Sequence, residues 1–121
     1  MTERKLILVT GPSSVFDFLE KLAETVRSEG VDVVHISDLK TPSDYVHWDD
    51  VNVLVPYATP CRDRDMGGAP KLRAIITPSL GYEGVDVSAA TRRGILVANG
   101  QAHENYQSVA EAAVMLTLMA T

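Results

Sequence analysis

Residues 72–119 read LRAIITPSLGYEGVDVSAATRRGILVANGQAHENYQSVAEAAVMLTLM, and this stretch decides the fold. Its first part, Leu72–Thr77, is a short apolar run that predicts a buried strand ending in a glycine turn. Asp86 is an expected N-cap, so a short helix should begin there and end at Gly94. A second apolar run, Ile95–Ala98, predicts another strand, and a nearly all-apolar helix is expected over 105–120.

The N-terminal part shows the same alternation of strands and helices. Leu6–Val9, Val31–Ile36 and Val51–Val55 are apolar runs that predict buried strands. Between the first two, apolar residues recur at helical spacing: Val15, Phe18, Leu19, Leu22, Ala23 and Val26. Strands that are apolar on both faces and alternate with helices indicate a covered parallel sheet. We therefore expect an α/β, flavodoxin-like parallel sheet of about five strands with helices on both faces, plus a C-terminal helix.

Composition narrows the class of protein. A chain of 121 residues is the size of one domain. Its net charge of −5 argues against a nucleic-acid partner, which would need a basic surface. The apolar run near the N-terminus is too short for a signal peptide or a membrane span, so no membrane partner is expected and the cytoplasm is the expected location.

The residues that most often bind metals are scattered along the chain. The single cysteine, Cys61, excludes an internal disulfide and a cysteine-based metal site, and we expect it in a loop or half-buried. His35, His47 and His103 have no partner at metal-ligand spacing. His35 should be structural and His47 a solvated loop residue. No metal site is predicted.

Ligands of such sheets bind in the loops at the carboxyl ends of the strands. One of these loops, Thr10–Ser14, precedes a helix and could hold a phosphate. However, the sequence contains neither GxGxxG nor GxxxxGK[ST], and a turn followed by an N-cap at Ser13 or Ser14 explains the residues equally well.

The segment 57–70 holds Pro60, Pro70 and a Gly-Gly pair, and it is expected to be a loop. Arg62 and Arg64 within it could clamp a carboxylate or a phosphate. Because two aspartates, Asp63 and Asp65, alternate with them, we interpret these arginines as locally neutralised side chains in solvent.

Several segments together resemble one family. Ser79–Asp86 is similar to a glycine turn often written G-x-G-x-D-x-x-D, and Asp86–Asn99 resembles the pattern DLEAATRRGIPVVN. Asn105–Glu111, which reads NYQSVAE, is similar to N-x-x-S-V-A-E. These are patterns of the D-isomer-specific 2-hydroxyacid dehydrogenases, which include phosphoglycerate, hydroxypyruvate and formate dehydrogenases.

The resemblance implies a domain organisation and an activity. Residues 1–104 would be the first segment of a substrate domain, and residues 105–121 a helix that leads to a nucleotide-binding domain absent from this chain. The family interconverts 2-hydroxy and 2-oxo acids with NAD or NADP. Its proton-transfer pair and its substrate-gripping arginine lie beyond the matching segment, so no catalytic residue is assigned here. The chain is expected to be a fragment that is inactive alone.

The resemblance also assigns site residues. Ser79, Leu80, Gly81 and Asn105 match positions that contact the small 2-hydroxy or 2-oxo acid, and Val109 matches a position near the nicotinamide. Several members carry an arginine directly after the third strand, where this chain has Pro56 and Tyr57. That departure counts against a phosphoglycerate-type substrate.

The expected C-terminal helix is almost entirely apolar. Val109–Ala120 is apolar on all sides apart from Glu111 and Thr117, so a homo-oligomer through this helix is expected.

The alternative to a dehydrogenase portion is a stand-alone, non-catalytic flavodoxin-like binding module. The reading frame beyond Thr121 discriminates between the two, since a GxGxxG motif there would favour the dehydrogenase.

Overall fold

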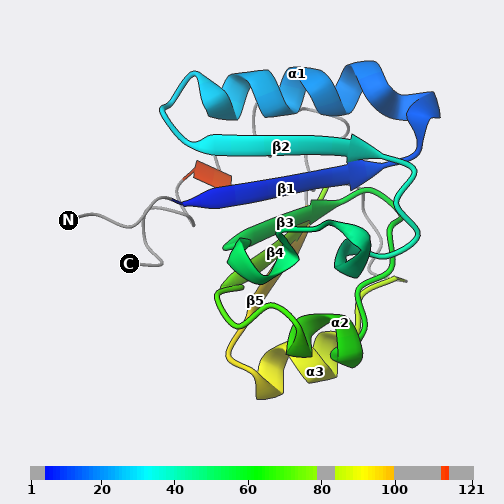
Figure 1. The fold of residues 1–121 in the computed structure, drawn as a ribbon, viewed down its shortest axis with the longest axis vertical. Helices are drawn as coiled ribbons and strands as arrows, with labels where there is room; N and C mark the ends of the chain where they lie inside the picture. Colours follow the sequence, from blue (N-terminus) through cyan, green and yellow to red (C-terminus); the bar gives the residue numbers. More distant parts are fainter. Residues whose placement is uncertain (1–4, 79–83, 100–112, 115–121) are drawn as a thin grey trace.

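The fold is a five-stranded parallel sheet between helices (Figure 1). The computed structural model describes residues 5–78, 84–99 and 113–114. The strand order is β2-β1-β3-β4-β5, which is the flavodoxin-like order, so the predicted fold is confirmed. The strands are β1 (Leu6–Gly11), β2 (Asp32–Ser37), β3 (Val53–Pro56), β4 (Ala74–Thr77) and β5 (Leu96–Asn99).

Helices cover both faces of this sheet. The helix α1 (Phe16–Arg27) lies over β1 and β2, whereas α2 (Asp63–Gly67) and α3 (Val87–Arg92) lie on the opposite side (Figure 1). Three 3-10 turns complete the described part: η1 (Ser13–Val15), η2 (Pro42–Asp44) and η3 (Trp48–Asp50).

The alternation of side chains along the strands builds two cores. Ile7, Val9 and Ile76 point to the α1 side, whereas Leu8 and Ile75 point to the other side, and all five are buried. Because successive strand residues face opposite directions, burial on both faces requires the unbroken apolar runs seen in the sequence.

The two described residues near the C-terminus belong to the α1-side core. Ala113 and Val114 are helical; Ala113 is fully buried and Val114 is half-buried against this core. The rest of the helix predicted over 105–120 lies outside the described residues.

The start of α1 differs from the prediction. Neither Ser13 nor Ser14 caps the helix with its side chain. Instead, Asp38 follows the neighbouring strand β2, and its Oδ1 accepts a hydrogen bond of 3.0 Å from the Ser13 N–H. The Asp38 N–H donates to the Gly11 carbonyl at 2.8 Å, and Asp38 adopts a left-handed conformation with φ of 63°. Asp38 thus supplies, from the end of the neighbouring strand, a partner for the first N–H of η1, the turn that precedes α1. Local spacing does not reveal such a contact.

The segment 57–70 is not a continuous loop, because α2 forms within it. The buried carboxylate of Asp65 accepts hydrogen bonds from the Arg62 N–H at 2.9 Å and from the Ser43 hydroxyl at 2.6 Å. Its carbonyl accepts a third from Trp48 Nε1 at 2.8 Å. Asp65 thus begins α2 and ties the 3-10 turns to it. A helix of five residues is too short to show a helical period.

The start and the end of α3 follow the prediction. The Asp86 carboxylate accepts a hydrogen bond of 3.0 Å from the Ala89 N–H. Gly94 takes a φ of 71° just after the helix, where a residue with a side chain would be strained.

Candidate functional site

The carboxyl ends of all five strands meet at one edge of the sheet, because the sheet is parallel throughout. We call this edge the carboxyl edge. It comprises the strand ends at Gly11, Ser37, Pro56, Thr77 and Asn99, with the loops that follow them. Open α/β sheets bind their ligands at this edge.

The loops after β3 and β4 are joined at the carboxyl edge. Cys61 and Val85 form an isolated parallel bridge. The Cys61 N–H donates to the Gly84 carbonyl at 2.7 Å, and the Asp86 N–H donates to the Cys61 carbonyl at 3.0 Å. A Cβ on Gly84 would lie 3.1 Å from Pro60 Cα, so the two segments approach more closely than a side chain would readily allow. The segment Gly84–Asp86 is therefore held against the loop after β3.

The loop after β3 is also fixed on its other side. The Tyr57 N–H donates to the Thr10 carbonyl at 2.8 Å, and the Tyr57 ring meets Phe18 edge-on with centroids 6.4 Å apart. Next to it, Ala58 is exposed and takes a left-handed φ of 62°. Such strain in a non-glycine residue persists only where the surroundings enforce it, and it is concentrated at functional loops.

The structure argues against phosphate at the loop 10–14. The Ser13 N–H, the first of η1, already donates to the Asp38 carboxylate. A phosphate placed there would face this negative charge instead of free backbone donors. A turn capped by Asp38 therefore explains the segment.

Cys61 is more deeply buried than the sequence suggested. Its side chain is 0% exposed. Burial, with a smaller contribution from the negative charge of Asp65, raises the pKa of the thiol to about 12. A thiol that stays protonated at neutral pH is a poor nucleophile.

We therefore expect Cys61 in the folded chain to resist alkylation by iodoacetamide at pH 8, because thiolate is scarce and the sulfur is inaccessible. Labelling should become complete in denaturing urea, as followed by mass spectrometry. Rapid labelling without urea would mean that the loop holding Cys61 opens readily.

His35 has the structural role that was predicted. Its Nδ1 lies 2.8 Å from Glu20 Oε1, and its ring stacks on Phe16 with centroids 4.7 Å apart. The hydrogen bond from His35, aided by Arg27, lowers the pKa of Glu20 below its usual range. This cluster fastens α1 to β2.

The remaining histidines offer no further site in the described part. His47 is exposed, as predicted, and His103 lies outside the described residues. Within residues 5–78, 84–99 and 113–114, no group of three or more His, Cys, Asp or Glu side chains could hold a metal ion.

The acidic partners of the two loop arginines were predicted wrongly. Asp63 binds Arg93 at 3.0 Å and lies 3.9 Å from Arg92, both near the end of α3. Asp65 is buried in the contacts that begin α2. Arg62 and Arg64 are exposed, as expected, but the aspartates beside them do not neutralise them by direct pairing.

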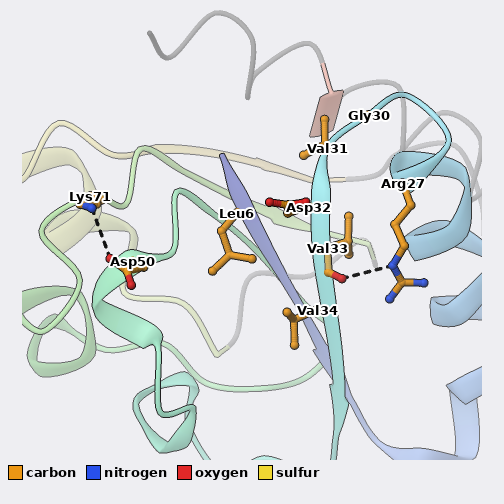
Figure 2. Close-up of a pocket in the computed structure, with 9 residues that line it drawn as sticks. All are labelled: Leu6, Arg27, Gly30, Val31, Asp32, Val33, Val34, Asp50 and Lys71. Atoms are coloured by element: carbon orange, nitrogen blue, oxygen red, sulfur yellow. Dashed lines mark hydrogen bonds and ion pairs between the residues drawn. The ribbon is translucent and has the colours of Figure 1, made fainter. Parts of the chain in front are cut away.

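A cleft of about 810 Å³ lies at the opposite, amino edge of the sheet (Figure 2). It opens around Leu6 and Asp32, the first residues of β1 and β2. Its basic groups have partners in the protein: Arg27 Nε donates to the Val33 carbonyl at 3.2 Å, and Lys71 Nζ lies 3.2 Å from Asp50 Oδ1. Since ligands of these sheets bind at the other edge, we do not assign a function to this cleft.

The residues that the sequence assigned to substrate and cofactor lie outside the described part. These are Ser79, Leu80, Gly81, Asn105 and Val109. The described residues that flank the first three are Pro78, directly after β4, and Gly84, held by Cys61. Both belong to the carboxyl edge. Ala58, in the loop after β3, is a residue of this edge that the sequence did not single out.

The family model described as D-isomer specific 2-hydroxyacid dehydrogenase, catalytic domain, matches residues 7–120. Among curated proteins, the D-3-phosphoglycerate dehydrogenases of Mycobacterium leprae and Mycobacterium tuberculosis are each 41% identical over 69 residues. The match covers 57% of this chain but only 13% of each relative.

Solved structures resemble the chain as well. The TT0316 protein of Thermus thermophilus is 27% identical, with a TM-score of 0.60 over 76% of this chain and 29% of that one. The NAD+-bound 3-phosphoglycerate dehydrogenase of Entamoeba histolytica is 19% identical, with a TM-score of 0.68 over 80% of this chain and 33% of that one. The NAD-dependent formate dehydrogenase of Staphylococcus aureus is 21% identical, with a TM-score of 0.64 over 78% and 30%. The last two likenesses concern the fold alone.

Proposed function

The chain belongs to the D-isomer-specific 2-hydroxyacid dehydrogenases, and we propose that it is the substrate-binding portion of an enzyme that interconverts a D-2-hydroxy acid and its 2-oxo acid. The observation that carries this proposal is the family match over residues 7–120, which includes every described strand except the first residue of β1. The chain spans about a third or less of the relatives described above, so the activity of the whole protein is an inference.

In this proposal the substrate binds at the carboxyl edge. Backbone N–H groups of the turn at Ser79, Leu80 and Gly81 would hold the carboxylate, as outward-pointing N–H groups of tight turns can. Asn105 would orient the reacting carbonyl or hydroxyl. Support comes from the flanking residues, since Pro78 and Gly84 both lie at this edge.

NAD or NADP would accept or supply the hydride, bound mainly outside this chain. The residues present do not fit the pyrophosphate of a dinucleotide: the sequence contains no GxGxxG, and the turn before α1 already binds the Asp38 carboxylate through the Ser13 N–H. We propose residues 1–104 as the substrate-domain segment and 105–121 as the connecting helix, with Val109 beside the nicotinamide.

Because the chemistry draws on NAD(P), the cytoplasm is the proposed location. None of the described helices is long and apolar enough to cross a membrane.

We expect the purified 121-residue chain to bind neither NAD nor NADH and to show no dehydrogenase activity. The reason is that the chain offers no dinucleotide-binding motif. Isothermal titration calorimetry on the isolated chain measures this directly. Micromolar affinity for either cofactor would contradict the proposal that NAD or NADP is bound mainly outside this chain.

We also propose that the chain self-associates through residues 105–121. The two residues described there, Ala113 and Val114, are apolar, and Val114 is only half-buried against the α1-side core. Each large apolar side chain left in water forgoes roughly 1.5–3 kcal/mol, which favours a contact between copies. Sedimentation velocity should show a dimer or larger species, and truncation after Glu104 should abolish it. A wild-type chain that stays monomeric at high micromolar concentration would refute the proposal.

Activity of the proposed enzyme is tested by joining the chain to a nucleotide-binding domain of this family, in place of the matching segment of a relative. NADH consumption with 2-oxo acids, under conditions where circular dichroism shows a folded protein, is the expected result. A folded fusion that consumes no NADH with any 2-oxo acid would favour the non-catalytic binding module. The names of the curated relatives make a phosphorylated three-carbon acid the first substrate to compare.

A further inference from the structure

The described sheet has two edge strands, β2 and β5, because the strand order is β2-β1-β3-β4-β5 (Figure 1). An edge strand presents unpaired backbone N–H and C=O groups, to which another strand can add. Proteins commonly protect such edges with charged side chains, proline or a covering segment. The two edges of this sheet differ in that protection.

The edge at β2 is protected by charged groups. β2 begins with Asp32, and the Val33 carbonyl accepts a hydrogen bond of 3.2 Å from Arg27 Nε (Figure 2). A side chain of α1 thus already occupies a backbone acceptor of this strand. Arg27 is fixed in turn by its ion pair with Glu20, at 3.0 Å. An incoming strand would have to displace this arginine.

The edge at β5 carries no charged side chain. The strand reads Leu96-Val97-Ala98-Asn99, and Leu96 is 60% exposed. Because Val97 packs against the core on the α2 and α3 side, the alternation of side chains puts Leu96 on the opposite, α1 side. There α1 lies over β1 and β2, far from β5, and Leu96 belongs to neither core (Figure 1).

The backbone of β5 is paired on one side. The Leu96 N–H donates to the Arg73 carbonyl at 3.0 Å, on the side of β4. Consecutive N–H groups of a strand point in opposite directions, so the Val97 N–H points away from β4. Within the described part of the chain, β4 is the sole strand that pairs with β5. The Val97 N–H is therefore directed at the position that an added strand would occupy.

A second copy of β5 fits this edge for two reasons. Its backbone offers the same row of donors and acceptors, and neither strand brings a charged side chain into the contact. The nearest cations, Arg73, Arg92 and Arg93, lie at the amino end of β5 or before it. An antiparallel arrangement about a two-fold axis keeps the arginines of the two copies apart, whereas a parallel one would set like charges side by side.

We propose that two copies of this chain associate through their β5 edges, with the two strands antiparallel, so that one sheet continues across the contact. This contact differs from association through residues 105–121 and does not rest on the proposed function. It makes β5 an interaction surface and Leu96 a side chain that becomes buried in it. Because β5 has four residues, the contact should be weak, with a Kd of roughly 0.1–1 mM.

Exchange of backbone amides with water, measured by NMR on the ¹⁵N-labelled 121-residue chain, tests this contact. The Val97 amide should exchange roughly two- to five-fold more slowly at about 1 mM protein than at about 20 µM, because pairing protects the associated fraction. The amides of β2 should exchange equally at both concentrations, since that edge is protected by Arg27.

Leu96→Lys and Val46→Lys form a matched pair of variants. Both introduce the same charge at an exposed apolar residue, 60% exposed at Leu96 and 81% at Val46, but Val46 lies between η2 and η3, outside the sheet. Leu96→Lys should remove the dependence of Val97 exchange on concentration, because a charge on an edge strand opposes pairing. Val46→Lys should keep it. Association that depends on residues 105–121 alone would not distinguish the two variants.

Three results would overturn the inference in a protein whose spectrum remains that of the folded chain. The first is Val97 exchange that is the same at both concentrations: fast exchange would leave the edge open, and slow exchange would assign it to another segment. The second is an unchanged concentration dependence in Leu96→Lys, and the third is its loss in Val46→Lys. Because none of these results concerns the carboxyl edge or a 2-oxo acid, the proposed function would be unaffected.

Discussion

Replacing Asn105 with alanine should lower kcat/KM for the 2-oxo acid by roughly 10- to 150-fold in the enzyme formed with a nucleotide-binding domain. That range corresponds to the loss of one hydrogen bond to a charged substrate, about 1.5–3 kcal/mol. Steady-state measurement of NADH consumption gives the ratio. The effect should be the largest that a single substitution in 105–111 produces.

Gln107→Ala is the matched control for this substitution. Gln107 lies in the same segment but at a variable position of the pattern N-x-x-S-V-A-E, so its removal should change kcat/KM little. If Asn105→Ala and Gln107→Ala behaved alike, the assignment of Asn105 to the substrate would be wrong.

Asp65→Ala should destabilise the fold by about 2–4 kcal/mol, because it removes the acceptor of two hydrogen bonds at a buried site. The Ser43 hydroxyl and the Arg62 N–H lose their partner, and α2 loses the contact that begins it. Because Trp48 also binds the Asp65 carbonyl, the 3-10 turns on the same side of the sheet should loosen too. Urea unfolding followed by circular dichroism measures the free energy.

The control for this prediction lies two residues earlier. Asp63 forms its ion pairs with Arg92 and Arg93 at the exposed surface, where such pairs contribute at most about 1 kcal/mol. Asp63→Ala should therefore unfold at nearly the wild-type urea concentration. Equal destabilisation by the two substitutions would contradict the role given to Asp65.

The sheet was predictable from the sequence because its signals are local. Each strand is an unbroken apolar run, and the parallel sheet follows from the helices between the runs. The cap at Asp86 and the glycine after α3 were found for the same reason, since each acts within a few residues of its own position.

The remaining features depend on contacts between distant segments. The first N–H of η1, the turn before α1, donates to Asp38 from the loop after β2, and α2 begins with a carboxylate that binds Ser43, 22 residues earlier. Similarly, the pairing of Cys61 with Val85 exists only once β3 and β4 lie side by side. No spacing rule connects such residues before the fold is known.

The candidate site, too, could be predicted from the sequence only in part. That ligands would bind at the carboxyl ends of the strands followed from the fold class. The assignment of Ser79, Leu80, Gly81, Asn105 and Val109 came from family resemblance and stays a prediction. The left-handed backbone of Ala58 emerged from the structure, because such a conformation at an alanine leaves no mark in the sequence.

The most direct test of the substrate-binding role is to map where a 2-oxo acid binds on the 121-residue chain. The amide signals of the ¹⁵N-labelled protein would be assigned and followed during titration with 2-oxobutyrate. We predict that the largest shifts occur at the carboxyl edge, at Tyr57, Ala58, Gly81 and Gly84, with none at Val31 in the amino-edge cleft. Shifts centred on that cleft, or none in a folded protein, would contradict the proposal.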